Sequence, residues 1–256
     1  MISGAEALRI GRPLASVSSW AAEIVVVLNT DVTDGTDVLC EQHGARVVRE
    51  PWKGHIAQKN SAAEKASQPW ILAIDADEVV TPALRDEIAR TLANPGDAAR
   101  FSAFSVPRLS RYAGRWIRHG DWYPDRKIRL WKRGAARWGG EDPHDRLEVI
   151  GAVGSLKADL EHYSYDNLAH HVSKLQSYSD IFVREAHARG RGARWFDLVV
   201  RPPWRFVRGY VLRAGFLDGW QGFVIAWMSA LLAFLKYAKL RESTTSRTQA
   251  AETSSR

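Results

Sequence analysis

The segment Trp70–Glu78, Trp-Ile-Leu-Ala-Ile-Asp-Ala-Asp-Glu, most constrains how this chain can fold. Its first five residues are mostly apolar and rich in branched side chains, which is typical of a strand buried on both faces. Asp75 and Asp77 follow directly, and in extended backbone a two-residue spacing points both carboxylates to one face. Two such carboxylates repel each other unless a cation lies between them, and hard oxygen ligands favour Mg²⁺ or Mn²⁺.

An alternative interpretation of the same acids remains open. Asp75 and Asp77 are also what solvated loop residues would look like ahead of the helix that begins near Thr81 and Pro82. Spacing alone does not choose between a metal site and a helix cap.

Strand and helix patterns alternate along the first part of the chain, which predicts an α/β fold with a Rossmann-like, mostly parallel, doubly wound sheet. Such sheets bind ligands outside the carboxyl ends of their strands, where Asp75 and Asp77 lie. The predicted strands are Glu23–Leu28, Ala45–Arg49 and Trp70–Ile74, and the predicted helices are Ala7–Val17, Thr36–His43, Ile56–Ser67 and Pro82–Leu92.

The pattern changes after Pro95. Phe101–Leu109 alternates as an antiparallel strand does, and Lys127–Trp131 and Leu156–Tyr163 are predicted as further strands. We interpret them as a mixed-sheet extension that covers the cleft and supplies the acceptor side of a site.

A doubly wound sheet should open with a strand that feeds the helix Ala7–Val17, and only Met1 and Ile2 are left to form it. The first strand is therefore predicted to be truncated, and we hypothesise that the true start of the protein lies upstream. An upstream reading frame that encodes several branched apolar residues would support this, and a stop codon there would exclude it.

The carboxyl-terminal part is predicted to be helical and amphipathic. Asn167–Ala188 has the pattern of one long helix, and Trp195–Leu240 mixes aromatic, aliphatic and basic residues. Its longest apolar run, Phe223–Leu235, is short for a membrane span, so we predict a helix lying in a membrane interface. A packed helical subdomain is the alternative. The Ser/Thr-rich end of the chain, 243–256, is predicted to be disordered.

The net charge of +7 implies attraction to an anionic partner. A nucleic acid is the least favoured partner because the basic residues alternate with apolar stretches and no nucleic-acid-binding module is visible. The single cysteine, Cys40, excludes an intrachain disulfide and every cysteine-based zinc site, which favours a reducing compartment.

Together these segments resemble the family 2 inverting glycosyltransferases with a GT-A fold, and more narrowly the lipopolysaccharide core-type β-glucosyltransferases of Gram-negative bacteria. The resemblance extends from about Trp20 to Leu240 and depends on the order and spacing of many short motifs. These are Glu23–Val27, Thr33–Thr36, Gln58–Asn60, Asp75–Glu78, Trp122–Asp125, Arg129–Leu130, His144–Asp145, His162–Tyr165 and Gly215–Trp220.

The resemblance implies a role for the acidic segment and for residues around it. Asp75-Ala76-Asp77 matches the family's Asp-X-Asp motif, which binds the nucleotide ribose and a divalent metal, Mg²⁺ or Mn²⁺, on the sugar diphosphate. That metal would stabilise the charge on the departing nucleoside diphosphate. The residues expected near the donor are Asp34, Gln58, Lys59 and Asp75, with Arg126 and Arg129 as phosphate contacts.

Inverting transfer needs one base to deprotonate the acceptor hydroxyl. Glu141, Asp142 and Asp145 compete for this role; we favour Asp145, with Asp142 second, although related sequences usually have glutamate at the Asp145 position. His144 is expected to orient the base, contact the diphosphate or help to hold the metal.

Two departures from the family pattern bear on recognition of the nucleotide base. The family's first strand and the loop after it are missing or reduced to Ile2–Glu6, and the aspartate usual after the second strand is replaced by Leu28-Asn29-Thr30-Asp31. Asn29 or Asp31 is expected to take over base recognition.

The resemblance thus implies a metal-dependent hexosyltransferase that uses a nucleotide-diphosphate sugar and a lipid-linked saccharide acceptor, peripheral on the cytoplasmic face of the inner membrane and held by its anionic surface. There are two alternatives. The enzyme could act on another polysaccharide or on a protein acceptor, or the chain could be a catalytically silent nucleotide-sugar-binding protein. The expected organisation is a GT-A domain at 1–165, with a donor half at about 1–95 and an acceptor half at about 96–165, then a helical membrane-interface segment at 166–242 and a tail at 243–256.

Overall fold

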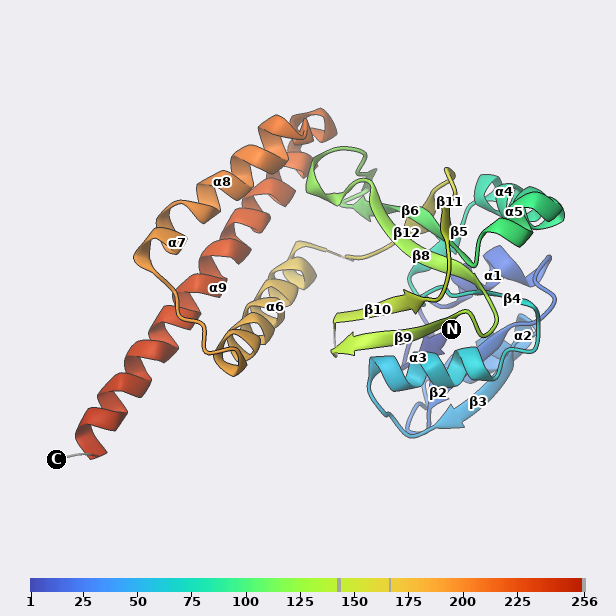
Figure 1. Ribbon diagram of the computed structural model, residues 1–256, viewed down its shortest axis with the longest axis horizontal. Coiled ribbons are helices and arrows are strands. Elements are labelled where there is room, and N and C mark those ends of the chain that lie inside the picture. The colour runs from blue at the N-terminus through green and yellow to red at the C-terminus, as the bar shows by residue number, and fades with distance from the viewer. Residues whose placement is uncertain (142–143, 166, 255–256) are drawn as a thin grey trace. The chain divides into compact units, whose positions relative to one another are not determined.

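The computed structural model describes residues 1–141, 144–165 and 167–254 (Figure 1). The chain forms two compact units. The first contains Met1–Leu109 and Asp125–Tyr163, and the second contains Ser110–Pro124 and the chain from Ser164 onward. The sequence-based division assigned 110–124 to the first domain, whereas these residues belong to the second unit in the structure.

One sheet of the first unit is parallel, with the strand order β1 (Ile2–Ser3), β2 (Val25–Asn29), β3 (Arg46–Glu50). Val27 lies opposite Ile2 on one side and Val48 on the other. β2 forms in the centre because Val25–Leu28 is a run of branched and apolar side chains that are all buried. The connecting helices α1 (Gly11–Ser18), α2 (Thr36–Gln42) and α3 (His55–Glu64) confirm the predicted alternation.

The other sheet of this unit is mixed, as predicted for the extension. β8 (Asp125–Lys132) is antiparallel to both β4 (Trp70–Leu72) and β6 (Ala103–Tyr112). The strand order is β4, β8, β6, then β12 (Leu160–His162) and β5 (Glu78–Val80), with β11 (Val153–Ser155) parallel to β6. The hairpin of β9 (Ala136–Glu141) and β10 (His144–Val149) and the helices α4 (Pro82–Ala93) and α5 (Pro95–Arg100) complete the unit.

The segment around β4 packs on both of its faces, as its apolar sequence predicts. Trp70, Leu72 and Ile74 contact one core cluster, which also contains side chains of α1 and α4. The alternate residues Ile71 and Ala73 contact a second cluster, which contains Trp131 and Trp138. The period of two expected of a strand therefore decides which side chains meet which layer.

The backbone after β4 corrects the prediction that Asp75 and Asp77 share one face. Ala76 and Asp77 form a turn, which the Glu78 amide closes by donating to the Asp75 carbonyl at 3.0 Å. The prediction that both carboxylates point to one face assumed extended backbone, so it is wrong for this turn. The sequence did not predict β5, because three residues that begin with a glutamate are too few to show the alternation of a strand. Pairing with β12 stabilises this strand.

Other predicted elements match or differ in detail. α4 begins where the sequence predicts, and its cap is Thr81 rather than Asp75 or Asp77, since the Thr81 hydroxyl accepts a hydrogen bond from the Leu84 amide at 3.1 Å. The predicted strand at 156–163 is reduced to Leu160–His162, because only these residues find a partner strand.

The second unit is mostly helical (Figure 1). α6 (Leu168–Ala188) confirms the predicted long helix, and Asn167 caps it by accepting from the His170 amide at 2.8 Å. The remaining elements are β7 (Arg115–Trp116), η1 (Gly120–Trp122), α7 (Trp195–Val199), α8 (Arg201–Val207), η2 (Arg208–Leu212), η3 (Gly215–Asp218) and α9 (Gly219–Ser254).

Glycine and a buried aspartate shape the start of α9. A Cβ atom on Gly215 would lie 2.6 Å from the Gly209 carbonyl oxygen, and one on Gly222 would lie 1.8 Å from the Gly215 carbonyl oxygen. Only glycine permits these approaches. Asp218, 2% exposed, accepts hydrogen bonds from the amides of Arg118 and His119 at 3.1 and 2.8 Å. The Gly215–Trp220 motif is therefore structural in this unit.

α9 differs from the prediction at both of its ends. Among the helices of the described residues, one, over Gly215–Thr244, is long and apolar enough to cross a membrane by length and composition. The prediction considered only the uninterrupted run Phe223–Leu235 and so underestimated the length. α9 also continues to Ser254, through most of the tail predicted to be disordered. Extending an existing helix needs no new nucleation, so weakly helical sequence can follow it.

His171 makes the second unit sensitive to acid. It is 3% exposed and its Nδ1 lies 2.9 Å from the Tyr112 hydroxyl, while Trp122 and Tyr165 stack on each other beside it. Burial, with a smaller effect of His170, lowers the pKa of His171 from 6.5 to about 4. As the pH falls below 6.5 the unfolded chain takes up a proton at this residue and the folded chain does not, so folding loses stability.

The variant His171→Asn keeps an acceptor for the Tyr112 hydroxyl but does not titrate. Between pH 7.5 and 5 we expect the wild type to lose about 2 kcal/mol more unfolding free energy than this variant. Urea titration at both pH values measures the difference. Equal pH dependence in the two proteins would contradict a neutral buried His171.

Candidate active site

Buried ion pairs hold the acidic segment in place. Arg129 of β8 donates from one Nη atom to Asp75 at 2.6 Å and to Glu78 at 2.5 Å. Arg108 of β6 contacts the same Glu78 oxygen at 3.2 Å and Asp125 at 2.6 Å. The Glu78 side chain is fully buried, so it depends on these guanidinium groups for its charge to be tolerated.

The environment keeps Asp75 ionised. Burial opposes the charged form, but the guanidinium of Arg129 and the ammonium of Lys59 outweigh it and hold the pKa of Asp75 well below its usual value. Burial likewise opposes the charge of Arg129, and the carboxylates of Asp75 and Glu78 raise its pKa above the usual value. Asp75 is therefore a permanent hydrogen-bond acceptor at this position.

Lys59 joins the acidic segment to the predicted base. Its Nζ lies 2.8 Å from Asp145 Oδ2 of β10 and 3.4 Å from Asp75 Oδ1, and it sits 4.5 Å from the centre of the Trp138 ring. The neighbouring Asn60 amide donates to and accepts from the Trp138 backbone, both at 2.9 Å, and so ties α3 to β9. Three residues predicted separately thus form one charged cluster.

Asp77 faces a different partner from Asp75. Its Oδ2 lies 3.3 Å from His162 Nε2 of β12, and its backbone carbonyl accepts from the Tyr163 amide at 2.8 Å. Sequence reasoning assigned no role to His162, although the motif His162–Tyr165 contributed to the family resemblance. That motif is the feature of the sequence that could have indicated a role for His162.

Among the described residues, several buried polar atoms of the first unit have no hydrogen-bond partner. They are Asn29 Oδ1 at the end of β2, both amide atoms of Gln58 on α3, and Nε of Arg129. Gln58 is completely buried. An unsatisfied buried polar group costs about 1–3 kcal/mol, so these atoms are suited to partners that a bound ligand or water supplies.

The other predicted donor residues lie elsewhere in the fold. Asp34 accepts from the Thr36 hydroxyl at 2.6 Å and from the Ala7 amide at 3.1 Å, which fixes the loop before α1 to the start of α2. Asp31 is exposed. Arg126 donates both Nη groups to the Leu156 carbonyl at 3.1 and 2.7 Å. Asp34 and Arg126 thus have structural contacts that hold the backbone in place.

Some predicted residues are outside what the structure describes. Asp142 lies outside the described residues, and the side chains of Glu141 and His144 are also outside them. Among the side chains that are described, no group of three or more His, Cys, Asp or Glu residues is arranged to hold a metal ion.

Comparison with known proteins identifies the family. The family model described as "Glycosyl transferase family 2" matches residues 5–146. The chain is 30% identical over 258 residues to an uncharacterized glycosyltransferase of Rickettsia felis, covering 95% of this chain and 88% of the relative. It is also 30% identical over 231 residues to the lipopolysaccharide core biosynthesis glycosyltransferase LpsC of Rhizobium meliloti, covering 86% and 82%. The chain belongs to glycosyltransferase family 2.

A solved structure supports the fold. S. aureus TarS 1–349 in complex with UDP-GlcNAc aligns with a TM-score of 0.50 and 13% identity, covering 96% of this chain and 90% of that one. With the family match, this likeness confirms the predicted GT-A-type fold. The protein is thus a glycosyltransferase, and its fold brings Lys59, Asp75 and Asp145 into one charged cluster.

The buried ion pairs predict a specific loss of stability. Arg129→Met should lower the unfolding free energy by about 3–5 kcal/mol, because the buried Glu78 carboxylate would keep Arg108 as its one ion-pair partner among the described residues. Lys127→Met is the control on the same strand; its ion pair with Asp125 is exposed and should contribute less than about 1 kcal/mol. Urea unfolding at pH 7 separates the two, and equal losses would contradict a stabilising role of Arg129.

Proposed function

We propose that this glycosyltransferase transfers a hexose such as glucose, with inversion and with Mg²⁺ or Mn²⁺, from a nucleotide-diphosphate sugar to a lipid-linked saccharide such as lipopolysaccharide core. The observation that carries the proposal is the contact of Lys59 with both Asp75 and Asp145. The name of the relative LpsC supports the acceptor class. The UDP-GlcNAc complex of TarS supports the donor class.

The donor would bind across the charged cluster. A diphosphate is an anion, and Lys59 and Arg129 are cations held in fixed positions by buried partners, so little ordering is needed when it binds. Asp75 stays ionised and can accept hydrogen bonds from ribose hydroxyls. Asn29 and Gln58 offer buried polar atoms that lack partners, and donor binding would satisfy them.

Of the two aspartates, Asp77 is the better metal ligand. Asp75 is already neutralised by Arg129 and Lys59, whereas the Asp77 carboxylate has the imidazole of His162 beside it. Carboxylate oxygen and imidazole nitrogen suit Mn²⁺, and carboxylate oxygen suits Mg²⁺. We assign the metal to Asp77, with Asp75 and His144 as the other predicted ligands. When bound, it would offset the negative charge of the departing diphosphate.

Asp145 is the proposed base. In a single in-line displacement, its carboxylate accepts the proton of the acceptor hydroxyl while that oxygen attacks the anomeric carbon and the nucleoside diphosphate leaves. Lys59 holds one Asp145 oxygen at 2.8 Å and so orients the carboxylate. Asp142 remains the second candidate for this role.

Two variants test the assigned roles. Asp77→Ala should abolish metal-dependent transfer with the fold intact, and Asp145→Asn should lower kcat by at least about 100-fold while donor binding is retained. The measurements are transfer from uridine-diphosphate sugars and calorimetric binding of uridine diphosphate with and without Mn²⁺. Asp86→Asn, an exposed carboxylate outside the cluster, is the control. Activity of either variant close to that of the wild type would remove that residue from the mechanism.

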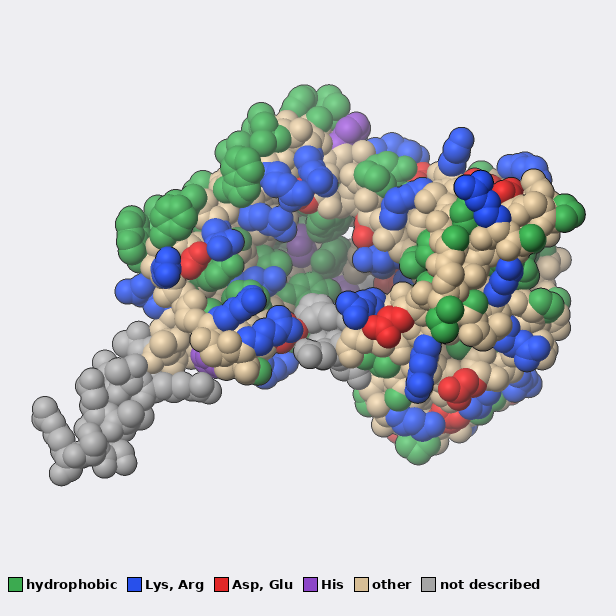
Figure 2. Space-filling model, in the orientation of Figure 1, with side chains coloured by type: hydrophobic (Ala, Val, Ile, Leu, Met, Phe, Trp, Pro, Cys, Tyr) green, Lys and Arg blue, Asp and Glu red, His purple; other side chains and the backbone are tan. Residues whose placement is uncertain are grey.

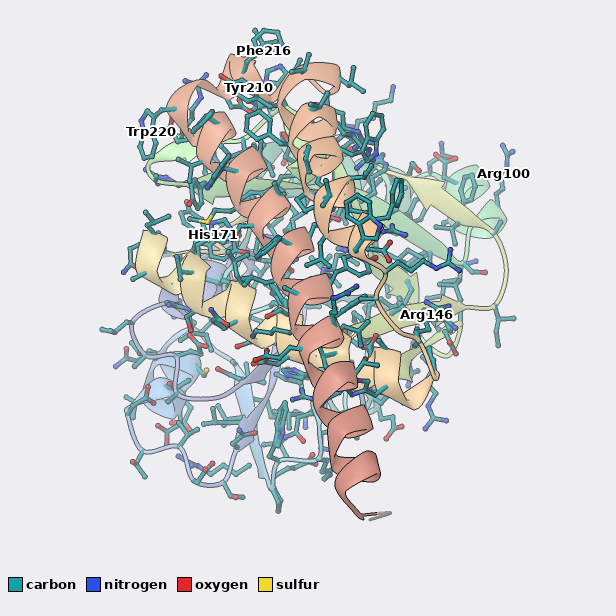
Figure 3. All side chains as sticks on the ribbon, turned by 90° about the vertical axis from the view of Figure 1, so that its left-hand side faces the viewer. Arg100, Arg146, His171, Tyr210, Phe216 and Trp220 are labelled. Carbon is teal, nitrogen blue, oxygen red and sulfur yellow. The ribbon has the colours of Figure 1, made fainter. Side chains whose placement is uncertain are left out.

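The second unit carries the proposed membrane contact. Large apolar side chains are exposed along α7, α8 and the start of α9, and Figure 2 shows hydrophobic side chains gathered over α7 and α8 with basic residues beside them. Figure 3 shows Tyr210, Phe216 and Trp220 at the end of the unit where α9 begins. Trp195 is 65% and Trp220 62% exposed. Exposed aromatic patches of this kind mark interaction surfaces.

An anionic membrane surface suits this patch better than a soluble partner does. Arg205, Arg208 and Arg213 all lie within 3.7 Å of one carboxylate, Asp121, so two of these three positive charges are left over. Each basic residue near an anionic membrane contributes about 1 kcal/mol. Only 22% of the apolar stretch within Gly215–Thr244 is buried in the fold, so this helix is not a core helix. We infer peripheral attachment at the cytoplasmic face of the inner membrane, where lipid-linked acceptors are available.

Vesicle sedimentation tests the membrane contact. The double variant Trp204→Ser/Trp220→Ser should partition at least about tenfold less onto vesicles that contain anionic lipid, because two exposed indole rings no longer enter the interface. Leu8→Ser is the matched control, since Leu8 is 98% exposed in the first unit. Equal partitioning of all three proteins would contradict a membrane contact through the tryptophans.

A further inference from the structure

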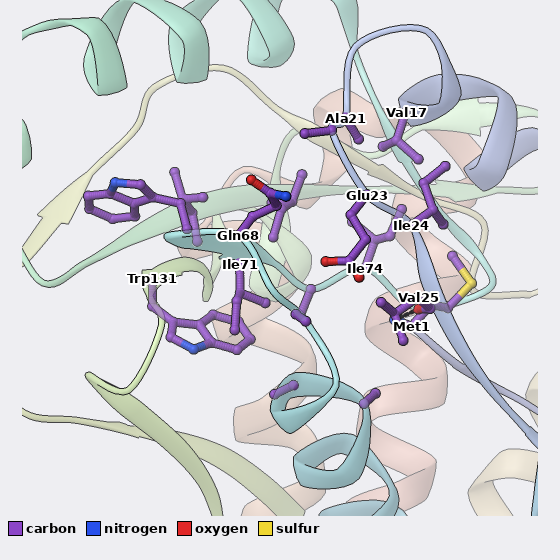
Figure 4. A pocket seen from close by; sticks show the side chains of 18 of the residues that line it. Met1, Val17, Ala21, Glu23, Ile24, Val25, Gln68, Ile71, Ile74 and Trp131 are labelled. Carbon is purple, nitrogen blue, oxygen red and sulfur yellow. Dashed lines mark hydrogen bonds between the residues drawn. The ribbon is translucent and has the colours of Figure 1, made fainter. Parts of the chain in front are cut away.

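An apolar cavity of the first unit adjoins the candidate active site. It has a volume of about 480 Å³, and Figure 4 shows Ile24 and Val25 on one side of it and Ile71 on the other. Its lining also includes Lys59 and Asp75 of the charged cluster. A ligand in this cavity would touch the proposed donor site, so the cavity is not a separate site.

Three arginines of the second unit converge on one carboxylate. Arg208 Nη1 lies 2.9 Å from Asp121 Oδ1, Arg213 Nε lies 3.4 Å from the same oxygen, and Arg205 Nη1 lies 3.7 Å from Asp121 Oδ2. Among the described residues, no other carboxylate forms an ion pair with these three guanidinium groups. Arginine keeps its proton in proteins, so three positive charges against one negative charge leave a net charge of +2.

A wide helical turn brings the third arginine to the others. η2 (Arg208–Leu212) is one turn of π-helix, in which the Arg213 amide donates to the Arg208 carbonyl at 2.9 Å. In an α-helix, residues with this spacing would lie about 140° apart around the axis and so on different faces. The wider turn instead puts both side chains beside Asp121. Single π-helical turns are rare and frequently occur at functional sites.

The backbone fixes Asp121 against this turn. The Gly120 amide donates to the Arg213 carbonyl at 2.9 Å, and a Cβ atom on Gly209 would lie 3.6 Å from Asp121 Oδ2. The space left beside the carboxylate is a cavity of about 10 Å³, which holds at most one water molecule. A larger ligand must therefore bind on the outer side of the arginines, whose side chains are 31% to 48% exposed.

The N–H groups of these arginines remain available to such a ligand. Both carboxylate oxygens of Asp121 are buried, yet in the described part of the chain neither accepts a hydrogen bond. The ion pairs are thus close in distance but not aligned as hydrogen bonds, so Asp121 holds the arginines together without using their donors. Each guanidinium has five N–H donors in a planar fork that fits two oxygens of a phosphate group.

We propose that Arg205, Arg208 and Arg213, gathered around Asp121, form a binding site for the phosphate monoester group of a membrane lipid. A phosphate monoester carries a charge of about −1.5 to −2 at pH 7, which matches the net charge of +2 of the site. A phosphodiester has one ionisable oxygen fewer and would leave part of the positive charge unpaired. The site therefore selects monoesters over diesters.

Exposed apolar side chains next to the arginines favour a lipid as the source of the phosphate. Val207, Val211 and Leu212 alternate with the arginines in α8 and η2 and are 39%, 53% and 63% exposed. Figure 3 shows Tyr210 and Phe216 at the same end of the unit. Acyl chains would contact these side chains, whereas a free phosphate ion would gain nothing from them. The site rests on the membrane contact proposed above and adds to it a preference among anionic lipids.

Charge-conserving variants test the site on vesicles. Arg208→Lys/Arg213→Lys keeps both charges but loses both planar forks, and Arg201→Lys, at an arginine of α8 paired with Asp197, is the matched control. Vesicles with phosphatidic acid, a monoester, are compared with vesicles that contain phosphatidylglycerol, a diester, at matched zeta potential. The wild type and the control should partition at least about fivefold more onto the monoester vesicles, and the double variant equally onto both. A wild type without this preference, or a double variant that retains it, would overturn the proposal.

Calorimetry with dihexanoyl phosphatidic acid below its critical micelle concentration measures the site without a membrane. The wild type should bind this lipid saturably, and Arg208→Lys/Arg213→Lys should lose that binding. Inorganic phosphate that binds as tightly as the lipid would overturn the assignment to a lipid. A wild type that binds the soluble lipid but no vesicles would remove the membrane contact and support the site. Unchanged binding of lipid and vesicles by the double variant would remove the site and leave the membrane contact intact.

Discussion

The contact of the Arg129 guanidinium with Glu78 and Asp75 is the interaction on which the first unit depends most. A charge removed from water must be paired, so a fully buried Glu78 requires Arg129 and Arg108 to stay in place. Those arginines belong to β8 and β6, so the pairing fixes the turn that carries Asp75 and Asp77 to the sheet. The position of this acidic turn is therefore a consequence of a structural requirement.

Lys59 links the acidic segment to the hairpin of β9 and β10. It contacts Asp75 on one side and Asp145 on the other, so the segment after β4 and the hairpin meet at one ammonium group. In the proposed donor site, a diphosphate would bind Lys59 with little loss of entropy, because the position of the ammonium group is already set before the ligand arrives. Asn29 Oδ1 and the buried Gln58 amide, which lack partners among the described residues, are further proposed contacts of the donor.

Local patterns predicted the elements whose formation depends on near neighbours. The buried run Val25–Leu28, the long helix that begins after Asn167 and the helix that begins near Thr81 all occur as expected, since apolar periodicity and helix-start signals act within a few residues. The predictions failed where a distant partner decides. The strand expected at 156–163 is short because only its last part pairs, and the Asp75–Asp77 backbone turns because Glu78 must reach Arg129.

The sequence by itself determined the class of fold, the family and the residues that carry its motifs. It could not determine which of these residues touch: Lys59 and Asp145 are 86 positions apart, and Asp75 and Arg129 are 54 apart. Nor could it show that Asp77 faces His162, that Asp34 and Arg126 hold backbone, or that an apolar cavity separates β2 from β4. Only tertiary structure decides such contacts, because they arise when strands and helices from distant parts of the chain pack and each buried charge takes the partner within reach.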